Sequence, residues 1–126
     1  MSTRSLVFLQ NKDESYDGIS CHYDGQVEAG VGEVLFNNYV TFSDVRELIN
    51  MGDASSIEDD IYESVFFCRD KDDDFNMYEV DDDEELENTI FNSDVSFVYL
   101  FKGNKWIFAE NDGSGEINWK DLEDEF

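Results

Sequence analysis

Two aromatic-rich runs near the C-terminal end constrain the fold of this chain most. The runs "VSFVYLF" (residues 95–101) and "KWIFAE" (105–110) flank the short polar segment "KGN" (102–104). Apolar runs of this length, rich in β-branched and aromatic residues and separated by a glycine-containing turn, are typical of paired antiparallel strands. The sequence therefore predicts a β-hairpin over residues 95–110, in a sheet that the rest of the chain must cover.

The same periodicity rules indicate further strands and helices. Strand-like runs are "TRSLVFLQ" (3–10), "GISCHYDG" (18–25), "SVFFCRD" (64–70) and "FNMYEV" (75–80). Helical spacing of apolar residues occurs in "AGVGEVLFNNYV" (29–40), "TFSDVRELINMGD" (41–53) and "DDDEELENTIFN" (81–92). No repeat or long linker divides the chain. We therefore predict a single α+β domain over residues 1–126, with an antiparallel sheet of about five strands and two to three helices on one face.

Three local predictions follow from this assignment. Ser43 is expected to cap the N-terminus of the second helix, because its hydroxyl can accept from a free backbone N–H. The segment "DKDDD" (70–74) is expected to form the turn between two antiparallel strands. The helix over residues 81–92 is expected to bury Leu86, Ile90 and Phe91, with acidic residues in its first turn, where the helix dipole favours them.

The net charge excludes several classes of function. The chain has 32 acidic and 8 basic residues, for a formal net charge of −24, whereas a magnitude of about 2 to 8 suffices for solubility. Nucleic acids and anionic membranes attract positive patches, so neither is an expected partner. Because 40% of the residues are hydrophobic, with eleven Phe and six Tyr, the composition is also unlike that of disordered acidic chains. The expected partner is a basic surface.

The acidic residues are concentrated in "CRDKDDDFNMYEVDDDEELE", residues 68–87. This segment holds eleven acidic residues and two basic ones, Arg69 and Lys71. Carboxylates at alternate strand positions, such as Asp72 and Asp74, lie about 6.6 Å apart. Helical i, i+4 pairs lie about 6 Å apart. Both spacings suit a row of groups that imitate phosphates, and the alternative is an acidic face that is only solvated.

The strand pairs that could carry this imitation are Asp72 with Asp74 and Glu79 with Asp81, and the helix pairs are Asp81 with Glu85 and Asp83 with Glu87. A folded chain of this mass exposes on the order of 7,000 Å², or one net charge per roughly 300 Å². Duplex DNA carries one charge per about 1.7 Å of axis, which is one per about 100 Å² on a cylinder of roughly 10 Å radius. The protein approaches this density only where its charge is concentrated.

A calcium loop is the alternative for "ENDGSGEINWKD", residues 110–121. Against the EF-hand pattern its ligands would be Glu110, Asp112, Ser114, Glu116 and Asp121. Glu replaces Asp at the first position, Asp replaces Glu at the last, and the preceding residues predict a strand rather than a helix. The segment 70–81 also matches at its first acidic positions, but Phe75 occupies the place where the sharp turn requires Gly. We predict no specific metal site.

The sequence contains no pattern that anchors catalysis. Cys21 and His22 are adjacent, but a zinc site there would need carboxylates to complete it, and a nucleophilic triad would need a pocket and a third residue. We expect a structural histidine, no cofactor and no enzymatic activity. No apolar stretch approaches the 18 residues of a membrane span. The N-terminal residues lack a secretory pattern, and two distant cysteines are typical of free thiols, so we expect a cytoplasmic protein.

The N-terminal half carries several short motifs in fixed order: "TRS" at 3–5, "CHYDG" at 21–25, "GVG" at 30–32 and "LINMGDASSI" at 48–57, with Leu35 and Tyr39 between them. In these the chain resembles a family of small uncharacterised proteins encoded by phages and prophages. Relatives usually have Trp in place of Tyr23 and a Pro within "QVEAG" (26–30). The resemblance implies a phage context and leaves open a small-ligand pocket around His22 and Tyr23. It supplies no catalytic residue.

Together these observations predict an inhibitor that acts as a DNA mimic. Very acidic small phage proteins often block restriction enzymes, CRISPR complexes or other DNA-binding host proteins, and this chain looks like a member of that functional class. Its partner would be a basic nucleic-acid-binding host protein, with oligomeric state open. The residues expected to bind this partner are Asp70, Asp72, Asp73, Asp74, Phe75, Tyr78, Glu79, Asp81, Asp82, Asp83, Glu84, Glu85 and Glu87.

Overall fold

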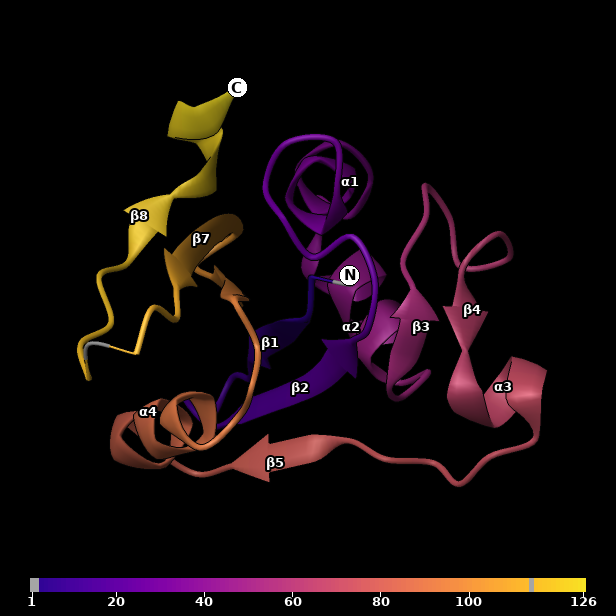
Figure 1. Cartoon of the computed structure of the whole chain (residues 1–126), viewed down its shortest axis with the longest axis horizontal. Helices are drawn as coiled ribbons and strands as arrows, with labels where there is room; N and C mark the ends of the chain where they lie inside the picture. Colours follow the sequence, from indigo (N-terminus) through magenta and orange to yellow (C-terminus); the bar gives the residue numbers. More distant parts are fainter. Residues whose placement is uncertain (1–2, 114) are drawn as a thin grey trace.

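A mixed β-sheet forms the centre of the protein in the computed structural model, which describes residues 3–113 and 115–126 (Figure 1). The strands are β1 (Ser5–Gln10), β2 (Tyr16–Cys21), β3 (Ala54–Ser56), β4 (Val65–Phe66), β5 (Tyr78–Val80), β6 (Phe97–Lys102), β7 (Lys105–Glu110) and β8 (Lys120–Asp121). The helices are α1 (Val31–Asn38), α2 (Phe42–Ile49), α3 (Phe67–Lys71) and α4 (Asp83–Phe91), and a 3₁₀ helix, η1, covers Leu122–Glu125.

The predicted C-terminal hairpin is confirmed. β6 pairs antiparallel with β7 from Phe97 opposite Glu110 to Lys102 opposite Lys105. The two residues between the strands, Gly103 and Asn104, both have positive φ angles, of 61° and 62°. Such a two-residue turn matches the twist of the strands that it joins, so the chain reverses direction without disturbing the pairing.

The sheet order is β4-β3-β2-β1-β6-β7-β8, with β5 also paired to β2. β1 is antiparallel to β2 but parallel to β6, so the predicted purely antiparallel sheet is wrong, and eight strands replace about five. β3, β4 and β8 have only two or three residues each. Strands this short are fixed by their neighbours and leave no periodic signal in the sequence.

The outer edge of β2 is shared between two strands. β5 pairs antiparallel with the first half, Tyr16 to Gly18, and β3 pairs parallel at Cys21. Between them the Asp53 carboxylate accepts a hydrogen bond from the backbone N–H of Ser20 at 2.9 Å, and the N–H of Asp53 donates to the carbonyl of Asn76. This arrangement holds the segment before β5 against the body of the sheet.

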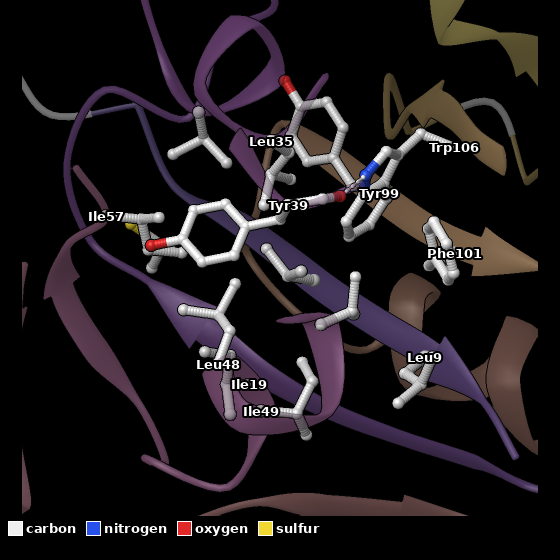
Figure 2. Close-up of a cluster of buried hydrophobic side chains, with 14 of the residues drawn as sticks. Leu9, Ile19, Leu35, Tyr39, Leu48, Ile49, Ile57, Tyr99, Phe101 and Trp106 are labelled. Carbon is white, nitrogen blue, oxygen red and sulfur yellow. Dashed lines mark hydrogen bonds between the residues drawn. The ribbon is translucent and has the colours of Figure 1, made fainter. Parts of the chain in front are cut away.

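Helices cover both faces of the sheet, which corrects the prediction that they lie on one. On one face α1 and α2 pack over Leu9 and Ile19 (Figure 2), and on the other α4 packs over Leu6 and Phe8. β1 is therefore buried on both sides, and Leu6, Val7, Phe8 and Leu9 are each 0% exposed. Each such side chain contributes roughly 1.5–3 kcal/mol by leaving water.

The larger of the two hydrophobic cores lies between the sheet and helices α1 and α2. Hydrogen bonds from two of its aromatic side chains stabilise it. The indole nitrogen of Trp106 donates to the carbonyl oxygen of Tyr39 at 2.8 Å, drawn dashed in Figure 2. The Tyr99 hydroxyl donates to the carbonyl of Gly25 at 2.6 Å. Because both donors are buried, these bonds avoid the cost of unsatisfied polar groups and join α1 and the loop before it to β6 and β7.

Several local predictions need correction. The N-cap of α2 is Thr41, whose hydroxyl accepts from the N–H of Asp44, so Ser43 is not the cap. Residues 64–70 form only a two-residue strand followed by α3, and β4 pairs with β3 rather than with β5. Residues 70–74 therefore do not form a turn between paired strands. α4 buries Leu86 and Ile90 as predicted, but Phe91 is 38% exposed.

No helix among the described residues is long and apolar enough to cross a membrane.

Candidate protein-interaction surface

The segment between α3 and β5, residues 72–77, is held in an extended path along one edge of the molecule (Figure 1). The backbone N–H of Asp73 donates to the carbonyl of Phe67. The ring of Phe75 packs on Gly52, where an added Cβ would lie 2.9 Å from it. Met77 packs against the larger core. The acidic segment is therefore an ordered part of the fold, although residues 72–77 have no regular secondary structure.

All eleven carboxylates of residues 70–87 are exposed, and we call them the acidic face. They are Asp70, Asp72, Asp73, Asp74, Glu79, Asp81, Asp82, Asp83, Glu84, Glu85 and Glu87. Their side chains fall into two groups, because some accept hydrogen bonds from the protein itself and the others do not. The first group is committed to the fold, and the second is available to a partner.

Two members of the acidic face stabilise the start of α4. Asp82 is the N-cap, and its Oδ1 accepts from the N–H of Glu85 at 2.9 Å. The Glu85 carboxylate in turn accepts from the N–H of Asp81 at 2.8 Å. The first bond satisfies an N–H group that the helix itself leaves free, and the second ties Glu85 to the residue before the N-cap. The negative charges also lie at the positive end of the helix dipole.

Asp83 links α4 to the sheet. Its Oδ1 accepts a hydrogen bond from the hydroxyl of Tyr16 on β2. Burial of the Tyr16 ring, followed by the hydrogen bond and the negative charge of Asp83, raises the pKa of the Tyr16 hydroxyl to about 12. The phenol therefore remains a donor at neutral pH and holds the first turn of the helix to the strand.

Asp70 is committed to the turn around α3. Its carboxylate accepts from the Nε of Arg69 at 2.9 Å and from the N–H of Phe66 at 2.9 Å. The hydrogen bond from Arg69, followed by the one from Phe66, lowers the pKa of Asp70. Arg69 also donates to the carbonyl of Ser64, and the ammonium of Lys71 lies 5.3 Å from the centre of the Phe67 ring. Both cations of the segment are thus engaged locally.

The other carboxylates of the acidic face are free of such contacts. Within the described part of the chain, seven side chains of the face accept no hydrogen bond and form no ion pair: Asp72, Asp73, Asp74, Glu79, Asp81, Glu84 and Glu87. The molecule exposes 6966 Å² for a net charge of −24, or one charge per about 290 Å². Residues 68–87, with eleven acidic and two basic residues, contribute −9 of the −24 from 20 of the 126 residues.

The spacing predicted for these carboxylates is found only in part. Asp83 and Glu87 lie within α4 at the expected i, i+4 interval. Asp72 and Asp74 lie outside any strand, and Asp81 precedes the helix, so its expected pairing with Glu85 is replaced by the backbone contact described above. The carboxylates of the acidic face therefore lack the regular spacing of a single strand or helix.

The fold adds two acidic residues that the sequence did not place here. Asp13 and Glu14, in the turn between β1 and β2, line a hollow of about 350 Å³ together with Asp81, Asp82 and Asp83. Gln10, Tyr16 and Lys102 complete its lining. The juxtaposition depends on the pairing of β2 with β5, which no local pattern reveals. It extends the acidic face across the adjoining end of the sheet.

The two aromatic residues predicted to anchor a partner differ in their surroundings. Phe75 is 50% exposed while one side of its ring rests on Gly52. Tyr78 is exposed at 37%, and its ring centre lies 6.1 Å from that of Phe8. Each ring therefore presents apolar surface close to carboxylates while one side of it rests on a buried residue, Gly52 or Phe8.

A second group of carboxylates lies apart from the acidic face. Asp44, Glu47, Asp59 and Asp60 line a hollow of about 180 Å³ beside Tyr62, whose side chain is 88% exposed. These residues belong to α2 and to the loop between β3 and β4. They offer an internal comparison for any effect assigned to the acidic face.

The segment considered as a calcium loop lies between strands and not between helices. Glu110 ends β7, and Asp121 ends β8, where its carboxylate accepts from the Lys105 ammonium at 2.9 Å. Ser114 lies outside the described residues. Among the residues that the structure does describe, no three His, Cys, Asp or Glu side chains form a group that could hold a metal ion.

Cys21 and His22 lie at the end of β2 in different environments. Cys21 is buried, and burial raises the pKa of its thiol to about 12, which leaves it a poor nucleophile. The His22 ring packs edge-on against Phe67, 4.8 Å between centres. His22 also lines a cavity, to which Tyr23 does not contribute.

Comparison with protein-family models, with curated proteins and with solved structures finds no match to this chain. Arguments about function therefore depend on the surface itself.

Proposed function

We propose that this protein is a non-enzymatic inhibitor that binds the basic nucleic-acid-binding surface of a host protein through the acidic face. The carboxylates take the place of phosphates in the groove of a restriction, CRISPR or other DNA-processing complex. The N-terminal motifs resemble those of phage-encoded proteins, which is why we propose a host target. An inhibitor of this kind would act in the cytoplasm of the host cell.

The observation that carries the proposal is the group of seven carboxylates without an internal partner on an ordered segment. Like charges held close together repel one another and destabilise the compact state. Solubility requires far less charge than −24. A surface that concentrates unpaired charge, on a backbone anchored by Phe75 and Met77, is suited to a partner with many cations.

The mode of binding follows from the same features. Charge complementarity steers encounter and accelerates association, and the effect weakens as salt screens the charges over about 10 Å at 0.1 M. Phe75 and Tyr78 add apolar contacts within the charged area, where aromatic residues are frequent binding hot spots. We therefore expect fast association, strong salt dependence and a residual contribution from the two rings.

Affinity capture from a bacterial lysate, with three matched baits, tests the proposal. The first bait is the unmodified protein. The second has the seven free carboxylates replaced by their amides, Asp→Asn and Glu→Gln, so that its net charge changes from −24 to −17. The third has the same change in charge at seven exposed acidic residues elsewhere: Glu28, Glu47, Glu58, Glu63, Glu123, Asp124 and Glu125.

The proposal expects nucleic-acid-binding proteins that the first and third baits retain at low salt and release at high salt. The second bait should not retain them. If the second and third baits capture the same proteins equally well, the position of the carboxylates does not determine binding, and the assignment to the acidic face is wrong. Retention of partners without nucleic-acid-binding activity would contradict the mimicry.

A further inference from the structure

A cavity of about 390 Å³ lies on the face of the sheet that α4 covers, beyond the C-terminal end of this helix. Its lining residues come from β2 and its end, from β1 and the residue before it, from β5, and from the connection between α4 and β6. They are Arg4, Leu6, Ser20, Cys21, His22, Tyr78, Asn92, Ser93, Asp94 and Val95. The volume is within the range of pockets that hold small molecules, roughly 300–1,000 Å³.

The alternation of side chains along the strands explains why the cavity is polar. Alternate residues of a strand point to the same face of the sheet, and Leu6 and Phe8 face α4. Arg4, two residues before Leu6, continues this row of side chains. α4 ends at Phe91, and its buried residues cover Leu6 and Phe8 but leave the far end of this row open. On β2 the corresponding positions beyond Gly18 are Ser20 and His22.

Polar side chains without internal partners line this cavity. Within residues 3–113 and 115–126, the Ser20 hydroxyl, the His22 ring, the Tyr78 hydroxyl and the Asn92 amide form no hydrogen bond with another protein group. Arg4 and Asp94 form an ion pair at 2.8 Å, and their side chains are 44% and 79% exposed. Leu6 and Val95 add apolar surface.

The chemistry of these groups selects the kind of ligand. Hydroxyl, amide and imidazole groups each offer both a donor and an acceptor, and the Arg4–Asp94 pair places donors next to an acceptor. Ligand hydroxyls, which donate and accept at once, satisfy such a lining best. Asp53 and Asp94 lie close enough to act electrostatically on Tyr78, and the protein carries −24 overall, so an anion would be repelled.

We propose that this cavity binds a small uncharged polyhydroxy compound, whose vicinal hydroxyls accept hydrogen bonds from Arg4 and donate to Asp94, with Asn92 and the neighbouring hydroxyls as further partners. A free saccharide and the ribose of a nucleoside share this chemistry. The site shares Tyr78 with the proposed partner-binding surface, but none of the seven free carboxylates of the acidic face lines the cavity. Either proposal can therefore fail without the other.

Titration of the isotope-labelled full chain, followed by the backbone amide signals of Ser20, His22 and Asn92, tests the inference. The probes are glucose, ribose and adenosine at millimolar concentrations, with adenosine monophosphate as the charged counterpart of adenosine. Saturable shifts with both glucose and ribose indicate a saccharide site. Shifts with ribose and adenosine but not with glucose indicate a nucleoside site. In low salt the monophosphate should bind more weakly than adenosine.

Two variants locate the binding. Tyr78→Phe and Asn92→Ala each remove one hydrogen-bonding group, which should weaken binding by roughly 3- to 10-fold. Tyr62→Phe is the matched control, because Tyr62 is exposed and does not line the cavity. Absence of saturable shifts with every uncharged probe would overturn the inference. So would tighter binding of the monophosphate than of adenosine, or equal weakening by Tyr62→Phe and Tyr78→Phe.

Discussion

Replacement of Asp82 separates the structural role of a carboxylate from its charge. Asp82 caps α4 through the N–H of Glu85, whereas the side chain of its neighbour Asp81 has no partner among the described residues. Asp82→Ala removes both cap and charge, Asp82→Asn keeps an equally good cap, and Asp81→Ala removes an equal charge without a cap. The relief of self-repulsion is common to all three variants, so differences between them isolate the cap.

The expected cost of losing the cap is about 1 kcal/mol, within a range of roughly 0.5–2. With an unfolding entropy near 2.1 cal/mol/K per residue, a chain of 126 residues loses about 4 °C in melting temperature per kcal/mol. Thermal unfolding followed by circular dichroism at low salt should place Asp82→Ala about 4 °C below Asp82→Asn and Asp81→Ala. Equal melting temperatures for the three variants would refute the division of the acidic face into structural and free carboxylates.

Three further predictions concern the core and its ionisable groups. Gly18→Ala should destabilise the protein by about 1–3 kcal/mol in denaturant unfolding. The reason is that the new Cβ would lie 2.4 Å from an atom of the Phe8 ring. A loss of stability below about 0.5 kcal/mol would mean that the Phe8 ring moves aside freely. The pKa of Tyr16 is raised to about 12, so the unfolded phenol ionises first, and stability that is fully present below pH 10 should be lost as the pH rises toward 12. Tyr16→Phe should flatten this alkaline loss in unfolding experiments, and an unchanged pH profile would contradict the raised pKa that burial and Asp83 give to Tyr16. A thiol reagent should label Cys68 rapidly in the native protein and Cys21 only on unfolding, because Cys21 is buried and Cys68 exposed; rapid labelling of both would contradict the packing of β2.

The parts of the fold that the sequence predicted are those with long periodic signals. The hairpin of β6 and β7 and the helix α4 were predictable from their apolar patterns. The continuous apolar run Leu6–Leu9 in β1 also carried the signal for burial on both faces, although we predicted helices on one face only. The short strands β3, β4 and β8 and the parallel pairing of β1 with β6 depend on contacts distant in sequence, which periodicity cannot report.

Some features of the candidate surface could likewise be predicted from the local sequence, and others depend on contacts between distant segments. Exposure of the eleven carboxylates of residues 70–87 follows from composition, since isolated charges are rarely buried. The capping roles of Asp82 and Glu85 had a readable signal, the spacing of a capping box, which the charge argument overlooked. The contact of Tyr16 with Asp83 and the approach of Asp13 and Glu14 join segments far apart in the chain, and only the folded structure reveals them.

We propose that the acidic face occupies the site where a host protein binds nucleic acid. The most direct test is a competition measurement with a captured partner, in which the affinity for labelled duplex DNA or RNA is determined at increasing concentrations of this protein. Nucleic acid and this protein should bind the partner in a mutually exclusive way. Competition should be retained by the variant altered at the seven distant acidic residues and lost when the seven free carboxylates of the acidic face are neutralised. A ternary complex of partner, nucleic acid and this protein would contradict it.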